Sequence, residues 1–508
     1  MRAHDMRILR KWLILVHRYL GIAVCLLVLM WFVSGIAMIY AGGMPRLSPQ
    51  ERLAHMPPLD LGRVRLTPIE AAVKADLAGA VGPAVLLTIM ARPAYRFNVG
   101  GPVNAFADTG EVLDEISEPQ SLAIAGLFMN LPMAAIHHVA VLNVPDQWTI
   151  GQSQMPLHKI TVDDRARTEL YVSGPLAEVV MQTTRDTRAL AWVAAIPHWL
   201  YFRALRTNGL LWTRVVLWTS SVAFVAAFLG LVLGVTQFRV LYASWMWWHY
   251  VTGAIFGVFT LTWLLSGFLS LEPIPWFARG GGGLGILETL GGGPPDLRAF
   301  PPMDETAWRT LLQGRQVKEI EFCRLQDEPY YCIRGSAGSP AESPEGRRAD
   351  TGPLLVAIDP LRMRREAFSR ESLMERVVRG YPDAPIVDAQ MLSSYDAYYY
   401  DRNHDRPLPV LRVKFGDADA TWIYIDWMSR FAGRFTRRQR VERWVYHGFH
   451  SLDFPFWYDK RPVWDIVVIV LCAGGAFLSA IGTVIGFKRL RRLVAPRRVE
   501  GRGLKVEG

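Results

Sequence analysis

The sequence predicts an α-helical membrane protein with a four-helix transmembrane core, built as a duplicated two-span unit, and two large soluble domains outside the membrane. Three observations predict this fold. Hydrophobic residues make up 51% of the 508 residues, four segments are long and apolar enough to cross a bilayer, and long polar stretches separate the first two and the last two of them. A spanning helix needs about 20 mostly apolar residues. This composition excludes an ordinary soluble protein.

The expected elements follow one another in a simple order. They are an N-terminal segment 1–11, a first span 12–40, a first soluble domain 41–210, a second span 211–236, a loop 237–246, a third span 247–271, a second soluble domain 272–462, a fourth span 463–487 and a basic tail 488–508. The first span begins like a signal peptide, but its apolar core exceeds the usual stretch of roughly 7–15 residues. We therefore expect an uncleaved anchor.

Lysines and arginines cluster at both ends of the chain, next to the first and last spans. Such residues are enriched on the cytoplasmic side of membrane proteins. Four spans place both termini on one side, so the two basic ends predict cytoplasmic termini. The soluble domains are then outside the cytoplasm, which means the periplasm if the source is a Gram-negative bacterium. We attribute the net charge of +10 to this topology and not to nucleic-acid binding.

Two of the four cysteines flank the segment LQDEPYY, which has the pattern of a β-hairpin. With a two-residue turn at Asp327 and Glu328, Cys323 and Cys332 would face each other, close enough for a disulfide. The sequence alone does not decide whether these two cysteines form a disulfide or are free thiols. The chain contains no C-x-x-C-H motif, which argues against covalently attached c-type haem.

The membrane part of the sequence is duplicated. The stretch HRYLGIAVCLLVLMWFVSG (17–35) aligns without a gap to HYVTGAIFGVFTLTWLLSG (249–267), sharing His, Trp, Ser and two Gly at equal positions. WVAAIPHWLYF (192–202) likewise aligns to WVYHGFHSLDF (444–454). The repeated unit is a span, a soluble domain, a histidine-bearing segment and a span. Because a removable signal peptide would not recur inside the chain, the repeat also argues that the first span is retained.

The duplication produces four histidines in two symmetric pairs. His17 and His249 lie near the cytoplasmic start of their spans, and His198 and His450 precede their spans on the outer side. Neutral imidazole is a common metal ligand and a standard axial ligand of haem iron. Two helices across a four-helix core can hold a haem from both of its faces. We therefore predict two non-covalent b-type haems with these histidines as axial ligands of the iron.

Glycines accompany the histidines at helical spacing. Gly21 and Gly253 follow their histidines by one turn, and Gly35 and Gly267 follow them by five full turns, so all face the same side as the imidazoles. Missing side chains at these positions leave room for a porphyrin. Small residues near the cytoplasmic ends of spans two and four add room there: Gly230, Gly234, Gly482 and Gly486. Two haems stacked across the bilayer would form an electron path.

Simpler interpretations compete with this prediction. A lone histidine at a membrane interface usually contacts head groups or water, and small residues usually serve close helix packing. His447, one turn from His450, is the rival outer ligand, but its repeat counterpart is Ala195, which argues against it. His137 and His138 are expected to be surface or loop residues.

Other segments carry weaker signals. The glycine-rich stretch 279–295 contains a formal dinucleotide fingerprint, but it follows a span and not a strand, so we expect a linker. The tyrosine run 393–407 is expected to be structural, with a substrate cleft as the alternative. The cytoplasmic parts are too short for a flavin or nicotinamide domain. Electrons would therefore come from a partner protein, a quinone or a docking reductant.

The sequence resembles the PepSY-associated transmembrane family, iron-regulated inner-membrane proteins that include ferric-siderophore reductases. The resemblance rests on HRYLG…WFVSG with its repeat, on WVYHGFHSLDFPFWYDKRPVWDIVV, and on PepSY-like segments at 66–116 and around WIYID–MSRFAGRF. It implies α+β PepSY domains in the periplasm, four spans and two haems. It also implies reduction of a ferric siderophore, or of another ferric chelate, at the outer face of the bacterial inner membrane.

Two other functions fit the sequence. One is a non-redox PepSY membrane protein that binds peptides or inhibits a protease, with its histidines acting only as interface residues. The other is a haem protein that passes electrons to a different outer acceptor, such as a periplasmic protein or copper.

Overall fold

The computed structural model describes residues 3–77, 82–152, 154–238, 240–273, 292–336, 354–364, 366–401, 406–426, 431–457 and 459–494. The chain divides into two compact units. A helical unit comprises 1–42, 192–277 and 444–508, and a sheet unit comprises 43–191 and 278–443. The predicted linker 279–295 lies almost entirely outside the described residues, as does the basic end of the tail.

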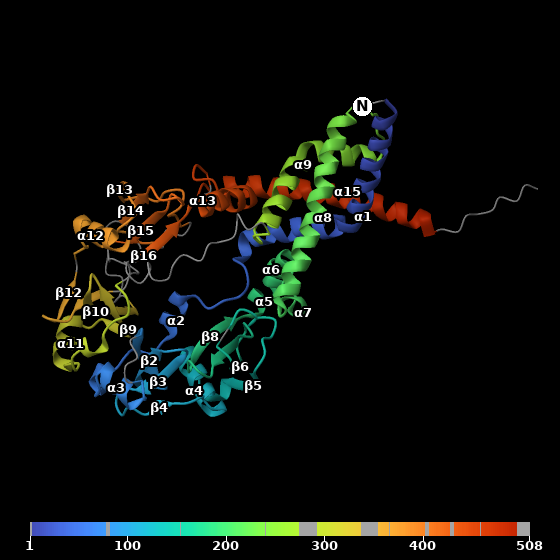
Figure 1. Ribbon diagram of the computed structural model, residues 1–508. Helices are drawn as coiled ribbons and strands as arrows, with labels where there is room; N and C mark the ends of the chain where they lie inside the picture. Colours follow the sequence, from blue (N-terminus) through green and yellow to red (C-terminus); the bar gives the residue numbers. More distant parts are fainter. Residues whose placement is uncertain are drawn as a thin grey trace, which may run out of the picture. The chain divides into compact units, whose positions relative to one another are not determined.

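Four long helices form the helical unit (Figure 1). Each is long and apolar enough to cross a membrane, which confirms the predicted four-span core. Helix α1 lies against α8 and α15, and α9 lies against the same two helices, so the four close into a bundle. Their bounds are α1 Ala3–Ala41, α8 Gly209–Thr236, α9 Trp245–Leu269 and α15 Val463–Val494.

Buried hydroxyl groups within these helices are satisfied locally. The side chains of Ser220, Thr252 and Ser479 each donate to the backbone carbonyl one turn earlier, over 2.6, 2.7 and 2.9 Å. In an apolar surrounding an unpaired polar group is costly, so such internal bonds let these residues occupy a spanning helix. The bundle also has an apolar cluster that includes Phe32 and Trp263, whose rings meet edge to face.

Short helices precede the second and fourth long helices and carry the outer histidines. They are α5 Arg185–Val193, α6 Ala195–Trp199 and α7 Arg203–Arg206 before α8, and α13 Arg437–Arg443, the π-helix η4 Trp444–Gly448 and α14 Phe449–Ser451 before α15. Helix α6 packs on α1, and α14 packs on α9. Both end at a leucine with left-handed backbone, Leu200 (φ 53°) and Leu452 (φ 48°). The repeat seen in the sequence thus has equivalent backbone turns.

The sheet unit contains three antiparallel sheets. Their strand orders are β12-β11-β10-β9-β1-β2-β3-β4, β5-β6-β7-β8 and β13-β14-β15-β16. The strands are β1 Ala84–Ile89, β2 Arg92–Asn98, β3 Pro102–Phe106, β4 Val112–Leu113, β5 Ile136–Leu142, β6 Leu157–Val162, β7 Glu169–Ser173, β8 Glu178–Thr183, β9 Gln316–Leu325, β10 Glu328–Ser336, β11 Leu354–Ala357, β12 Arg362–Arg364, β13 Ile386–Leu392, β14 Val410–Phe415, β15 Trp422–Asp426 and β16 Phe431–Phe435. Helices α2 Pro49–His55, α3 Pro68–Lys74, α4 Glu118–Met129, α11 Glu305–Leu312 and α12 Arg370–Gly380 complete it.

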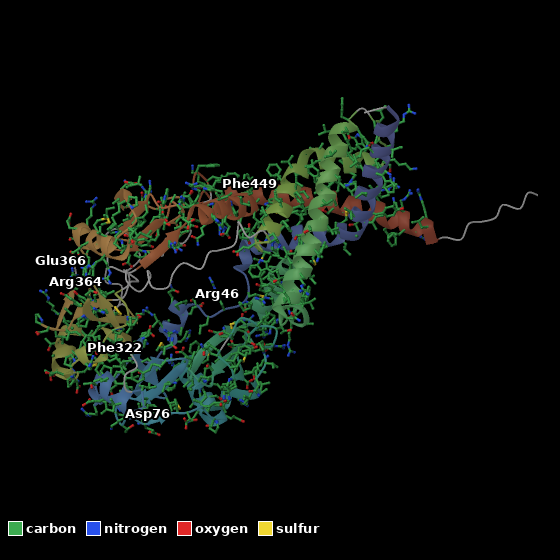
Figure 2. All side chains as sticks on the ribbon, in the orientation of Figure 1. Arg46, Asp76, Phe322, Arg364, Glu366 and Phe449 are labelled. Carbon is green, nitrogen blue, oxygen red and sulfur yellow. A yellow bond between two sulfur atoms is a disulfide. The ribbon has the colours of Figure 1, made fainter. Side chains whose placement is uncertain are left out.

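The largest sheet joins strands from both long polar stretches of the sequence. Strand β1 pairs with β9, with Leu86 opposite Ile320. The fully buried rings of Tyr95 and Tyr331, on β2 and β10, lie in the same core as Phe322, which Figure 2 labels. The two stretches therefore share one sheet and one core. The predicted combination of a helical core with α and β structure outside it is confirmed at this level.

The duplication extends into the small sheets. Asp146 accepts hydrogen bonds from the Tyr171 hydroxyl at 2.8 Å and from Lys159 at 3.3 Å. In the other small sheet, Asp396 accepts from Tyr424 at 2.9 Å and from Arg412 at 3.0 Å. In each sheet an aspartate from the loop before β6 or β14 thus contacts a basic residue on that strand and a tyrosine on the next strand, β7 or β15.

The predicted hairpin around LQDEPYY is present, but its turn differs by one residue from the predicted turn. Leu325 pairs with Glu328, so Gln326 and Asp327 form the turn, with φ values of 54° and 64°. A two-residue hairpin turn of this kind needs a left-handed backbone at both central positions. Glu328 precedes Pro329, and a residue before proline favours an extended backbone, so Glu328 begins the next strand and Gln326 takes its place in the turn.

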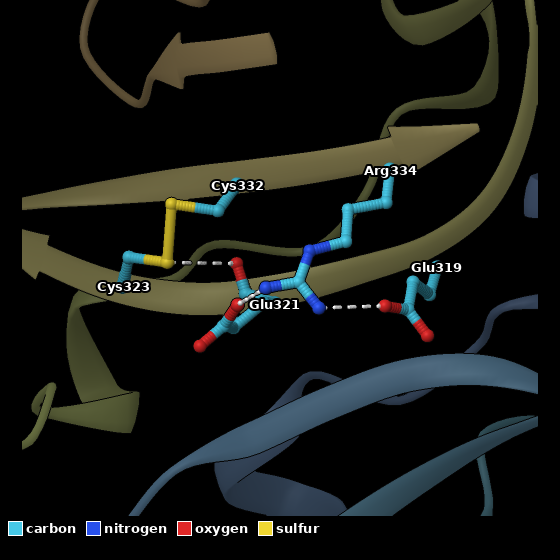
Figure 3. Close-up of a disulfide and its surroundings, with 5 residues drawn as sticks. All are labelled: Glu319, Glu321, Cys323, Cys332 and Arg334. Carbon is cyan, nitrogen blue, oxygen red and sulfur yellow. Dashed lines mark hydrogen bonds and ion pairs between the residues drawn. A yellow bond between two sulfur atoms is a disulfide. The ribbon is translucent and has the colours of Figure 1, made fainter. Parts of the chain in front are cut away.

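The shifted turn leaves the two hairpin cysteines diagonal to each other and not directly opposite. They are nevertheless disulfide-bonded, with Cα atoms of Cys323 and Cys332 6.1 Å apart (Figure 3). Next to the bridge, Arg334 forms ion pairs with Glu319 and Glu321, each at 3.0 Å. Diagonal side chains on one face of an antiparallel pair are close enough for this bond.

We expect thiol counting to report this bridge directly. Maleimide should modify two cysteines in the denatured, unreduced protein, namely Cys25 and Cys472, and four after reduction. In Cys323→Ser the count should be three under both conditions, because Cys332 loses its partner. Mass spectrometry of the labelled chain gives the count, and four labels on the unreduced wild type would contradict the bridge.

Candidate functional site

The structure brings the four repeated histidines together in two pairs within the helical unit. The first pair joins His17 of α1 to His249 of α9, with ring centroids 6.2 Å apart. The second pair joins His198 of α6 to His450 of α14, with ring centroids 6.1 Å apart. Figure 2 labels Phe449, which directly precedes His450 on α14. Each pair takes one residue from each half of the duplicated sequence.

In the first pair, the backbone fixes which nitrogen of His17 carries the proton. Its Nδ1 lies 2.9 Å from the carbonyl oxygen of Ala226 on α8. A carbonyl oxygen only accepts, so Nδ1 donates and Nε2 keeps its lone pair. The Nδ1 of His249 is buried near the backbone of Leu478 but makes no hydrogen bond of ordinary geometry within the described residues.

In the second pair, serine hydroxyls and backbone carbonyls surround Nδ1. The Nδ1 of His198 lies 3.2 Å from both the Trp31 carbonyl and the Ser34 hydroxyl. The Nδ1 of His450 lies 3.0 Å from the hydroxyl of Ser266. These bonds again direct the proton to Nδ1 and the lone pair to Nε2.

Both members of the second pair are neutral near pH 7. Burial lowers the pKa of His198, although its hydrogen bond to Trp31 opposes the effect. Burial, together with the neighbouring ring of His198, lowers the pKa of His450 to about 3. A histidine must be neutral to bind a metal, so both rings are in the binding form across the physiological pH range.

A glycine faces each of the four rings. A Cβ atom at these positions would lie 2.9 to 3.7 Å from the Cε1 atom of the facing ring: Gly230 at His17, Gly35 at His198, Gly267 at His450 and Gly482 at His249. At Gly230 the separation is the shortest, 2.9 Å. The predicted glycines Gly35 and Gly267 therefore line the second pair and allow its rings to approach the long helices.

The other two predicted glycines, Gly21 and Gly253, do not face the imidazole rings closely. A Cβ at Gly21 would meet only Cys25 Sγ at 3.9 Å, and one at Gly253 would meet only Leu478 Cδ1 at 3.8 Å. Both are ordinary contact distances. A Cβ at either position would thus touch an existing side chain, so the packing around Gly21 and Gly253 does not display the predicted space for a porphyrin.

The donor set fits a haem held by two histidines. A metal lies about 2.0–2.1 Å from an imidazole nitrogen, so two imidazoles on opposite sides of one ion have ring centroids about 6 Å apart. The observed separations are 6.2 and 6.1 Å. Within the described residues, no Nε2 atom of the four rings makes a hydrogen bond.

A metal ion held only by protein side chains fits the described residues less well. No group of three or more His, Cys, Asp or Glu side chains is arranged there to hold an ion. A haem iron needs only its axial ligands from the protein, because the porphyrin supplies the rest. Pairs of histidines, and not larger clusters, are what such a cofactor requires.

His447, His137 and His138 are not members of the two pairs, although His447 is close enough to His450 to lower its pKa. His447 is exposed on the π-helix, and its ring contacts Tyr446. His137 is exposed, as expected, and forms an ion pair with Asp163 at 2.7 Å, although it lies on strand β5. His138, on the same strand, was expected at the surface but is largely covered, and its Nε2 lies 3.2 Å from His158 Nδ1.

The tyrosine run is structural in its described part. Tyr399 is buried, stacks on Tyr424 and donates to the carbonyl of Pro407 over 2.7 Å. Tyr395 donates to the carbonyl of Arg406. These bonds fasten the loop across the small sheet β13–β16. Residues 402–405 of the run lie outside the described part of the chain.

In the sequence, Ser34 and Ser266 stand out only as identical residues at equivalent positions of the repeat. The structure gives both a contact with the second pair. The available signal was the dipeptide Ser-Gly, which ends both copies of the aligned stretch 17–35 and 249–267. A hydroxyl next to a glycine, repeated on two helices, is compatible with many packing roles, so its histidine partner was not predictable.

No model of a known protein family matches this chain, and no curated protein matches it either. The resemblance to the PepSY-associated transmembrane family therefore stays a prediction. The function is argued from the geometry of the two histidine pairs.

Proposed function

We propose that this protein is a di-haem transmembrane electron-transfer protein that reduces a ferric siderophore, or another ferric chelate, for iron acquisition. The observation that carries the proposal is the pairing of the four repeated histidines at ring separations of 6.2 and 6.1 Å. In this proposal His17 and His249 hold one haem b, and His198 and His450 hold the other.

The residues of the chain prepare these sites for binding. A bound haem supplies reversible one-electron transfer at its iron. The carbonyl of Ala226 keeps the proton of His17 on Nδ1, and the hydroxyls of Ser34 and Ser266 do the same for the second pair. Apolar side chains of the bundle exclude water and so contribute to the reduction potential. Reduction to Fe(II) weakens the hold of hard oxygen donors on the substrate iron.

The proposed location is the bacterial inner membrane, with both termini in the cytoplasm and the sheet unit in the periplasm. Basic residues in the first turns of α1 and in the last turns of α15 support cytoplasmic ends. The disulfide between Cys323 and Cys332 supports an oxidising compartment for the sheet unit. A quinone or a cytoplasmic protein is the proposed electron donor.

The visible spectrum of the full-length protein tests the proposal. Protein purified in detergent from haem-replete cells should contain two haems b per chain and show the sharp reduced bands of bis-histidine ligation. The dithionite-reduced protein should then reoxidise on addition of a ferric chelate, with ferrous iron recovered by a chromogenic trap. A colourless but folded protein would contradict the proposal. Coloured protein that ferric chelates fail to reoxidise would leave a different outer acceptor.

A further inference from the structure

Ser34 lies near the C-terminal end of α1, and Ser266 lies at the equivalent position near the C-terminal end of α9. Each side chain is only 1% exposed, so both hydroxyls are buried. The Ser34 hydroxyl lies 3.2 Å from Nδ1 of His198, and the Ser266 hydroxyl lies 3.0 Å from Nδ1 of His450. Each serine therefore contacts the histidine of its own half of the chain.

The direction of these hydrogen bonds follows from the hydrogen count of a hydroxyl. The Ser34 hydroxyl donates to the carbonyl of Met30 over 2.7 Å, and the Ser266 hydroxyl donates to the carbonyl of Trp263 over 3.0 Å. A hydroxyl has one hydrogen and two lone pairs. Each serine oxygen, with its hydrogen already used, accepts the Nδ1–H of its histidine.

In the described part of the chain, no serine or threonine hydroxyl forms a hydrogen bond with either ring of the first histidine pair. The Nδ1 of His17 donates to a backbone carbonyl, and the Nδ1 of His249 is buried without a hydrogen bond of ordinary geometry within the described residues. Serine acceptors thus distinguish the second pair from the first. An acceptor on Nδ1–H fixes the ring and makes Nε2 a stronger electron donor to a bound metal.

We propose that Ser34 and Ser266 are positioning residues that hold the two imidazoles of the second pair and lower the reduction potential of the iron they bind. This inference rests on the proposed function. A stronger Nε2 donor favours the ferric state and so lowers the reduction potential. Because Ser34 contacts His198 and Ser266 contacts His450, the effect is confined to the second site. The proposal predicts that the potentials of the two haems respond independently to substitutions at these positions.

The test is a spectroelectrochemical titration of the full-length protein with Ser34→Ala, Ser266→Ala and both. One of the two midpoint potentials should rise while the other stays fixed. The expected change in the ratio of reduced to oxidised haem at a given potential is about three- to tenfold, or roughly 30–60 mV for one electron. The ferric low-spin electron paramagnetic resonance signal of the same haem should shift as well. Ser34→Thr, which retains a hydroxyl, should restore the wild-type potential.

Ser220→Ala is the matched control. Ser220 is 4% exposed, lies on α8 and donates to the carbonyl of Val216 in the same way, but its hydroxyl contacts no histidine of the described residues. Two haems with unchanged potentials in the double serine variant would overturn the inference and leave the proposed function standing. Equal shifts in Ser220→Ala, or loss of the second haem from Ser34→Thr as well as Ser34→Ala, would also overturn it. Wild-type protein without haem would instead overturn the proposed function.

Discussion

His198→Ala and His450→Ala are each expected to remove the same haem, so that the purified protein carries one haem per chain instead of two. The two rings are 6.1 Å apart and come from different halves of the chain. Removing a residue that only hydrogen-bonds to a metal ligand commonly weakens metal binding about 10–100-fold. Removing the ligand itself should weaken binding more. Haem content from the pyridine haemochrome spectrum, divided by protein concentration, gives the measurement.

Combining substitutions tests whether the histidines act as pairs. His198→Ala with His450→Ala should lose no more haem than either single variant, because both act on one site. His198→Ala with His249→Ala should lose both haems. His447→Ala is the matched control, since this exposed residue is one turn from His450 and should retain both haems. Loss of a haem from His447→Ala, or additive losses within the second pair, would contradict the assignment.

The sequence predicts the helical unit well because its signals are local or repeated. Four apolar runs identify the long helices by hydropathy alone, and the repeat identifies the histidines that meet. Hydropathy reports residence in lipid and not the helix ends, so α1 begins at Ala3, well before the predicted span, and α15 continues through its basic residues. Hydropathy therefore predicts that these helices exist but not where they begin and end.

The sheet unit is less predictable because its decisive contacts are not local. The pairing of Leu86 with Ile320 links segments that lie far apart in the sequence. The residue pattern of neither strand predicts which strand it pairs with. The hairpin turn lies one residue earlier than predicted because Glu328 precedes Pro329, and a residue before proline favours an extended backbone. Gln326 therefore takes the left-handed position next to Asp327. The covered position of His138 likewise depends on its neighbour His158 on the next strand.

Gly230→Leu is expected to remove the haem of the first pair and leave that of the second. A Cβ at Gly230 would lie 2.9 Å from Cε1 of His17, closer than side chains normally approach. The hydrogen bond from Nδ1 to the carbonyl of Ala226, one turn earlier on the same helix, holds the ring against α8, so the ring cannot move away from Gly230 without losing that bond. Overpacking at a constrained site costs about 1–3 kcal/mol, enough to displace the ring from its partner His249. Haem content should fall from two to one per chain.

The retained second haem serves as an internal check that the bundle is folded, because His198 and His450 contact other residues. Gly209→Leu is the matched control on the same helix, where a Cβ would meet only Arg206 at 3.7 Å. In a His198→Ala background, Gly230→Leu should abolish the remaining haem, whereas Gly209→Leu should preserve it. Retention of that haem in the Gly230→Leu variant would show that His17 does not hold the first haem in this position. A leucine at residue 230 would clash with the His17 ring as it lies in the structure.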